Sequence, residues 1–244
     1  MNVTRGSSLS SLDPLPVFAR LAAELHQEPD EATASQAIVT RLREVVPEAR
    51  RVSLAVRESR GLRTLASSDR LANEADALQY ALGEGPAIEV VDQGGWLRVG
   101  DVDSDARWQG WAPRAAALGV RSLLAVALVD GEETLGALTV YGTDPGGFSE
   151  RDAVEHALAY AAHAATALAC TRRAATLETA VSSRHVIGMA QGIAMERYGI
   201  GAQQSFELLR RLSSTTNVKL RDVAAQIVET RTIPVERDRE HSED

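Results

Sequence analysis

Residues 121–142 read RSLLAVALVDGEETLGALTVYG, and this stretch decides the fold. Two aliphatic runs, 121–129 and 135–142, flank the turn sequence DGEE. Aliphatic and β-branched residues on both sides of a glycine-containing turn are typical of a β-hairpin. The stretch therefore predicts the strongest pair of strands in the chain.

The residues before this hairpin predict further strands and helices in an irregular order. RVSLAVR (51–57) and LRTLA (62–66) alternate apolar and polar residues, which indicates a second hairpin. A helix is predicted over 69–82, a glycine-punctuated loop over 83–95 and a short strand over 96–102. Because strands and helices do not alternate strictly, the fold class predicted is α+β, with an antiparallel sheet flanked by helices.

A long linker helix is predicted to follow the sheet. Ser149 and Asp152 resemble a capping box, and no Pro or Gly follows until Gly188. A four-three apolar spacing within this helix is typical of a coiled-coil seam. The seam predicts a homodimer, although the same face would also suit packing on the chain's own sheet. Its residues are Val154, Leu158, Ala161, Ala165 and Leu168.

Three shorter amphipathic segments end the chain, around 186–194, 206–212 and 220–227, and they predict a compact three-helix bundle. Positions 172–231 hold nine Lys or Arg against five acidic residues, a net charge of +4. The whole chain has a net charge of −8, so this region departs in sign from the rest. Such a region is a candidate for binding a polyanion, and a solvated helix face is the simpler alternative.

No combination of residues predicts catalysis, a bound metal or a cofactor. The sequence lacks a P-loop, a G-x-S-x-G elbow and an H-E-x-x-H helix. His156 and His163 are seven residues apart, which is too far along a helix to chelate one ion. The single cysteine, Cys170, excludes an internal disulfide and favours a reducing compartment. We therefore expect a non-enzymatic, cytoplasmic protein without a membrane partner.

The three tryptophans of the chain, Trp96, Trp108 and Trp111, cluster between predicted strands. Loops over a sheet can wall a ligand pocket, and aromatic side chains often line such pockets. These residues are therefore a candidate ligand pocket, with ordinary core packing as the alternative.

Two stretches, GEGPAIEVVDQGGWLRVGDVDSDARW (83–108) and RSLLAVALVDGEETLGALTVYGTDPGGFSERD (121–152), resemble the GAF domain. The resemblance implies a sensory module with a central antiparallel sheet and an unidentified small-molecule or protein signal. A cysteine often follows the GEGP turn in related proteins, whereas this chain has Ala87. That departure removes thiol chemistry and chromophore attachment at this position.

The stretch RHVIGMAQGIAMER (184–197), followed by SFELLRRLSSTTNVKLRDVA (205–224), resembles the ANTAR domain. The resemblance implies an RNA-binding output module of transcription antitermination regulators. Many members have Lys at the position of Gln191 and Leu at that of Ala194. An amide in place of the lysine removes a cation but keeps hydrogen-bonding groups.

Basic and polar residues outside the apolar faces of the bundle are the expected RNA contacts. Cations would neutralise phosphates, and polar side chains would address unpaired loop bases. The expected contacts are Arg184, Gln191, Arg197, Arg210, Arg211, Ser213, Asn217, Lys219 and Arg221.

Together these features predict a cytoplasmic, signal-responsive homodimer that binds stem-loops in nascent mRNA and controls transcription termination or translation. A DNA-binding transcriptional regulator and a ligand-binding or protein-interaction scaffold with a degenerate ANTAR unit are the alternatives. The expected organisation is a disordered start (1–14), a GAF-like sensor (15–147), a coiled-coil linker (148–176), an ANTAR-like domain (177–233) and a disordered acidic tail (234–244).

Overall fold

The computed structural model describes residues 23–24, 28, 30–46 and 49–233. The disorder expected for 1–14 and 234–244 concerns residues outside this range. The chain divides into two compact units, with the boundary between Arg173 and Ala174.

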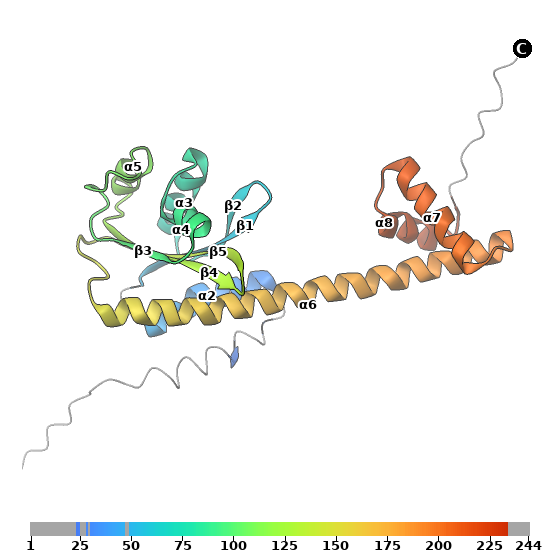
Figure 1. Cartoon of the computed structure of the whole chain (residues 1–244), viewed down its shortest axis with the longest axis horizontal. Helices are drawn as coiled ribbons and strands as arrows, with labels where there is room; N and C mark the ends of the chain where they lie inside the picture. Colours follow the sequence, from blue (N-terminus) through green and yellow to red (C-terminus); the bar gives the residue numbers. More distant parts are fainter. Residues whose placement is uncertain (1–22, 25–27, 29, 47–48, 234–244) are drawn as a thin grey trace, which may run out of the picture. The chain divides into compact units, whose positions relative to one another are not determined.

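The first unit is built on a five-stranded antiparallel sheet with the strand order β2-β1-β5-β4-β3 (Figure 1). Both predicted hairpins are present in it. The strands are β1 (Arg51–Glu58), β2 (Gly61–Ser67), β3 (Trp96–Val99), β4 (Ser122–Asp130) and β5 (Glu133–Gly142).

The central hairpin of β4 and β5 pairs from Ser122 opposite Gly142 to Asp130 opposite Glu133. Gly131 closes its turn with a φ of 63°, a conformation that glycine adopts without steric cost. Nearly all side chains of β4 and β5 are buried, including neighbours that point to opposite faces. Helices cover both faces of the sheet, which explains the continuous apolar runs (Figure 1).

One face of the sheet packs against α2 (Glu31–Val45) and the first part of α6 (Arg151–Tyr198). The Tyr160 hydroxyl donates a hydrogen bond to the carbonyl oxygen of Ile38 over 2.9 Å, which links the two helices. The pKa of Tyr160 is raised because the hydroxyl is buried.

The five residues expected to form a dimer seam lie in this core. Ala161, Ala165 and Leu168 are buried, and Val154 and Leu158 pack against the same cluster. This placement corrects the expectation, since a face covered by its own sheet is not available to a second copy. The sheet itself supplies the apolar partner that the four-three spacing requires.

The other face of the sheet packs against α3 (Arg70–Leu82), α4 (Pro86–Gln93) and α5 (Trp111–Ala117) (Figure 1). The predicted loop over 83–95 is wrong for its middle part, which forms α4. Pro86 has the fixed φ that suits a first helical position, and Val90 and Val91 bury the apolar side of the short helix.

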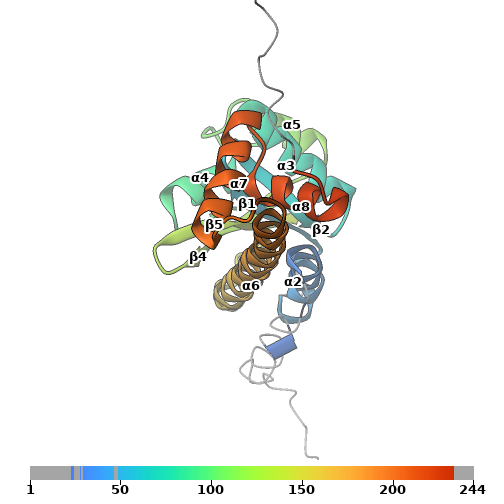
Figure 2. The ribbon, with the colours of Figure 1, turned by 90° about the vertical axis from the view of Figure 1, so that its right-hand side faces the viewer.

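The second unit consists of the last part of α6, α7 (Ala202–Thr216) and α8 (Leu220–Thr230) (Figure 2). Helix α6 continues through Gly188 and Gly192 and stops at Gly199, which has a φ of 61°. The bundle core contains Ala190, Ala194, Leu209, Leu212, Val223, Ala224, Ile227 and Ile233. The predicted class, an α+β sheet domain with a long helix and C-terminal helices, is confirmed.

Candidate nucleic-acid interface

The outer flank of α7 carries an exposed aromatic side chain beside basic and polar ones. Ser205, Leu209 and Leu212 are buried toward the bundle. Phe206, Arg210 and Asn217 follow at helical spacing on a different flank, and all three are exposed. Phe206 has 39% of its surface exposed although it is aromatic. We call Phe206, Arg210, Ser213 and Asn217 the α7 flank.

The end of this flank is held in a fixed turn. The Ser213 hydroxyl donates a hydrogen bond to the carbonyl oxygen of Val218 over 2.6 Å. Asn217 ends α7 with a φ of 54°, in the left-handed region that Asn tolerates better than most residues. Lys219 follows in the same turn and is exposed. Ser213 and Asn217 therefore shape the turn that positions Lys219.

Gln191 links α6 to the start of α7. Its Nε2 donates a hydrogen bond to the carbonyl oxygen of Ala202 over 3.0 Å and lies 3.5 Å from the Ser205 hydroxyl. The NH₂ group of the amide thus donates within the bundle. Gln191 therefore connects α6 to the first turn of α7.

The remaining expected cations do not join the α7 flank. Arg197 Nη1 donates to the carbonyl oxygen of Arg231 over 3.2 Å, and Arg221 Nε lies 3.2 Å from the Asp222 carboxylate. Arg221 also lines a hollow beside α6 together with Glu178. Arg184 is exposed on α6, and Arg211 occupies another edge of α7 than Arg210. The nine expected contacts are therefore separated into several groups.

The spacing of Phe206, Leu209 and Leu212 predicts one shared apolar face for this segment. The structure buries Leu209 and Leu212 but leaves Phe206 exposed. The four-three spacing of Ser205, Leu209 and Leu212 fits a helix face better, and it leaves Phe206 outside. Tyr198, at the end of α6, is 44% exposed and was also missed.

The three tryptophans do not form a pocket. Trp111 is fully buried, and its Nε1 donates to the carbonyl oxygen of Ala75 over 3.0 Å. Trp108 packs edge-on against Trp111 with the ring centroids 5.7 Å apart. Trp96 lies on edge strand β3 and is 50% exposed. Two of the three are core residues, which corrects the expected aromatic pocket.

A buried carboxyl, that of Asp76, joins α3 to the sheet. It accepts hydrogen bonds from the hydroxyls of Tyr141 (2.5 Å), Thr64 (2.7 Å) and Ser53 (3.0 Å). Burial raises the pKa of Asp76, and the three hydroxyls offset only part of that shift. The same burial, together with the Asp76 charge, raises the pKa of Tyr141. The carboxyl has no exposed surface and cannot contact a substrate directly.

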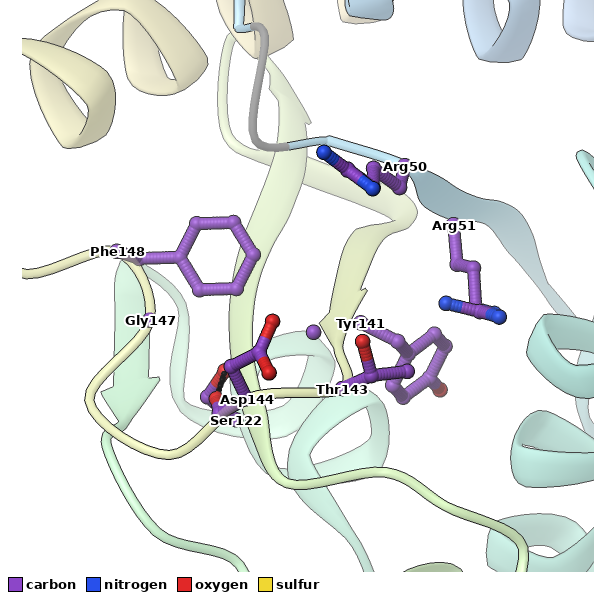
Figure 3. A pocket seen from close by; sticks show the side chains of 9 residues that line it. Arg50, Arg51, Ser122, Tyr141, Thr143, Asp144, Gly147 and Phe148 are labelled. Atoms are coloured by element: carbon purple, nitrogen blue, oxygen red, sulfur yellow. Dashed lines mark hydrogen bonds between the residues drawn. The ribbon is translucent and has the colours of Figure 1, made fainter.

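A cavity of about 390 Å³ lies at the junction between β5 and α6 (Figure 3). Its walls come from the start of β1, the start of β4 and the loop that leads into α6. We call it the junction cavity, and its side chains include Arg50, Arg51, Ser122, Thr143, Asp144 and Phe148.

Two negative observations apply to the described part of the chain. None of its helices is both long enough and apolar enough to span a membrane. Within the same residues, no group of three or more His, Cys, Asp or Glu side chains is arranged to hold a metal ion.

Comparisons with known proteins agree with this architecture. The GAF domain model matches residues 28–169, and the ANTAR domain model matches residues 175–228. A search of the curated proteins finds no match.

Two solved structures illustrate the likeness of the first unit. The GAF domain of a phosphoenolpyruvate-protein phosphotransferase from Coxiella burnetii is 17% identical over 66% of this chain and 96% of its own, with a TM-score of 0.54. The corresponding GAF domain from Acinetobacter is 14% identical over 67% of this chain and 96% of its own, with a TM-score of 0.53. At these identities the likeness concerns the fold.

Proposed function

Since this chain belongs to the GAF domain family and carries an ANTAR domain after its GAF domain, we propose that it reads RNA in response to a signal. In this proposal the ANTAR domain binds short stem-loops in nascent mRNA. A bound stem-loop prevents an overlapping terminator hairpin from forming, or changes access to a ribosome-binding site. The GAF domain supplies the signal that controls binding.

The observation that carries the proposal is the composition of the α7 flank and the turn after it. Arg210 and Lys219 are exposed cations, and each can neutralise a phosphate and release a counterion. Phe206 offers an exposed aromatic face on which an unpaired loop base can stack. Cations beside an aromatic ring on a fixed helix suit single-stranded loop bases better than the edges of a closed duplex.

We further propose that the chain forms a homodimer through the outer face of α6. Leu177 and Val181 are 66% and 67% exposed, which is unusual for large aliphatic residues. Gly188 and Gly192 continue the same line, and a Cβ added at either would meet open space. A second α6 helix would cover the aliphatic residues and approach closely at the glycines. Two linked ANTAR domains bind an RNA that contains two hairpins far more tightly than a single domain does.

The GAF domain acts in this proposal by binding rather than by catalysis. Asp76, the buried carboxyl with a raised pKa, is enclosed by hydroxyl groups that hold the domain together. A strongly perturbed group often marks an active site, but structural networks perturb a pKa in the same way. The exposed thiol of Cys170 supports a reducing, cytoplasmic location.

A mobility-shift experiment tests the proposal. The full chain is titrated against a hairpin RNA with a six-nucleotide loop, the same stem closed without a loop, and a duplex DNA of the stem sequence, all at equal salt. We expect the looped RNA to bind most tightly and Phe206→Ala to remove most of its advantage over the loopless stem. Preference for the duplex DNA would identify a DNA-binding regulator instead. Absence of any shift at low salt would overturn the proposal in favour of a scaffold.

A further inference from the structure

The junction cavity carries opposite charges on different sides. Figure 3 shows the Arg50 guanidinium and the Asp144 carboxylate on different sides of the hollow, with the Phe148 ring to one side of both as a third wall. Among the described residues, neither charged group of this pair has an ion-pair partner. Their charges therefore remain available to a ligand.

Arg51, the second arginine of the cavity, forms an ion pair with Asp69. Its Nε lies 3.2 Å from the Asp69 carboxylate, an ion pair in which this buried atom makes no hydrogen bond. Arg51 therefore closes one side of the cavity and leaves Arg50 as the cation that faces a ligand.

The loop that forms the floor of the cavity is tightly constrained. The Ser122 hydroxyl donates to the carbonyl oxygen of Asp144 over 2.8 Å. A Cβ at Gly142 or Gly147 would come within 2.4 or 2.3 Å of that hydroxyl oxygen, so a larger residue at either position would displace the Ser122 side chain from this hydrogen bond. The Asp144 backbone is thus fixed at one place, as a binding group requires.

Phe148 stores backbone strain beside the cavity. It has a φ of 56°, which is costly for a bulky side chain, and the residue is buried. Its neighbours in sequence, from Arg151 onward, form α6. Strain of this kind persists only where the surroundings enforce it, and it often accompanies a ligand site or a switch.

We propose that the junction cavity binds a small zwitterion, a free amino acid, and that this ligand is the signal of the GAF domain. The ligand carboxylate pairs with Arg50, the ammonium group pairs with Asp144, and an apolar side chain rests on Phe148. A volume of about 390 Å³ falls within the range of small-molecule sites, roughly 300–1,000 Å³. The role as a signal rests on the proposed function, whereas the binding itself does not.

The site is well placed to act on α6. Phe148 belongs to the core that holds α2 and the first part of α6 on the sheet. A ligand that binds one arrangement of Phe148 more tightly than another shifts the population toward it. The beginning of α6 is the element on which that shift acts first.

The test is calorimetric titration of the full chain with each of the twenty standard L-amino acids. The deaminated and decarboxylated counterparts of the amino acid that binds, 4-methylpentanoate and isoamylamine in the case of leucine, serve as probes that each keep only one of its two charges. We expect saturable one-to-one binding of at least one amino acid and weaker binding of both single-charge probes. Arg50→Gln and Asp144→Asn should each weaken that binding at least about tenfold, because each removes a charge-assisted contact.

Arg60→Gln, in the turn between β1 and β2, is the matched control and should bind like the unaltered protein. Arg50 and Asp144 are exposed, so their variants should keep the melting temperature of the unaltered protein. Failure of all twenty amino acids to bind, or binding that survives both cavity variants, would overturn the proposal. Binding of the deaminated probe as tightly as the amino acid would overturn the zwitterion assignment. Amino-acid binding without an RNA shift would reject the proposed function alone.

Discussion

The first unit encloses the carboxyl of Asp76 among three hydroxyl groups, whereas the second unit leaves Phe206, Leu177 and Val181 open to solvent. The enclosed network satisfies its polar groups internally, so it contributes to stability without a partner. The exposed aromatic and aliphatic side chains bury little apolar surface in the folded chain, so they contribute little to its stability. Under the proposed function, the first unit folds without a partner, and RNA and a second copy of the chain cover the exposed surfaces of the second unit.

The largest expected effect comes from charging the outer face of α6. Leu177→Glu combined with Val181→Glu should dissociate the proposed dimer and lower affinity for a two-hairpin RNA by roughly a hundredfold or more, because avidity is lost. Affinity for a single hairpin should change little. Analytical ultracentrifugation and mobility shifts measure the two properties. Val129→Glu, an exposed site on β4, is the control and should leave both unchanged.

Removing Asp76 should destabilise the first unit and spare the second. Asp76→Ala leaves the hydroxyls of Tyr141, Thr64 and Ser53 without their acceptor, at a cost of about 3 kcal/mol in the free energy of unfolding. Asp76→Asn, which keeps an acceptor, should cost less. Chemical denaturation of the sheet domain measures the loss, while hairpin affinity should remain the same. Equal losses for Ala and Asn would contradict the role assigned to the network.

The raised pKa of Asp76 also predicts a pH dependence. The folded state holds the proton more tightly than the unfolded state, so this contribution to stability is complete below the unfolded pKa. It declines as the pH rises toward the folded pKa, by at most about 1.4 kcal/mol per pH unit for one group. As the pH rises above 4, the unaltered protein should therefore lose stability relative to the Asp76→Asn variant, which has no carboxyl to titrate at this position. A difference independent of pH would show that Asp76 titrates normally.

A smaller effect is expected from the aromatic group of the α7 flank. Phe206→Ala should weaken looped-hairpin binding by about 1–3 kcal/mol, the usual contribution of one base stacked on an aromatic ring. Phe206→Trp should restore it. Because Ala is a good helix former and Phe206 is exposed, circular dichroism should show an unchanged helix content. Loss of binding in the Trp variant would argue against stacking.

The smallest expected effect is a difference between Arg210 and Arg221 in how much each contributes to the salt dependence of RNA binding. Arg210→Gln should reduce the slope of log affinity against log salt by about 0.7–0.9, the value for one phosphate contact. Arg221→Gln should change it less, because Arg221 already pairs with Asp222. Mobility shifts at several salt concentrations measure both slopes. Equal changes would place both arginines on the RNA surface.

The strands were predictable from the sequence because their signal is local. The turn DGEE and the runs on either side specify β4 and β5 within 22 residues, 121–142. Helix α4 was missed because its flanking glycines, Gly85 and Gly94, are typical of loops. In the structure they act as helix caps around a short apolar segment.

The surfaces were harder to predict, because a helix pattern shows that a face is apolar without showing what covers it. The stripe containing Ala161 and Leu168 has coiled-coil spacing, yet the chain's own sheet covers it. The exposed stripe with Leu177 and Val181 is shorter and is interrupted by Arg184. Similarly, the expected RNA cations were chosen by charge, and only the folded bundle shows that Arg197 and Arg221 have internal partners.

Crosslinking the protein to RNA in cells and sequencing the bound fragments tests the RNA-reading role most directly. We predict that the recovered fragments contain recurring pairs of short hairpins with unpaired loops, located upstream of terminators or ribosome-binding sites. Phe206→Ala should lower their recovery. Fragments spread evenly over transcripts, or recovery no greater than in samples that were not irradiated, would contradict that role.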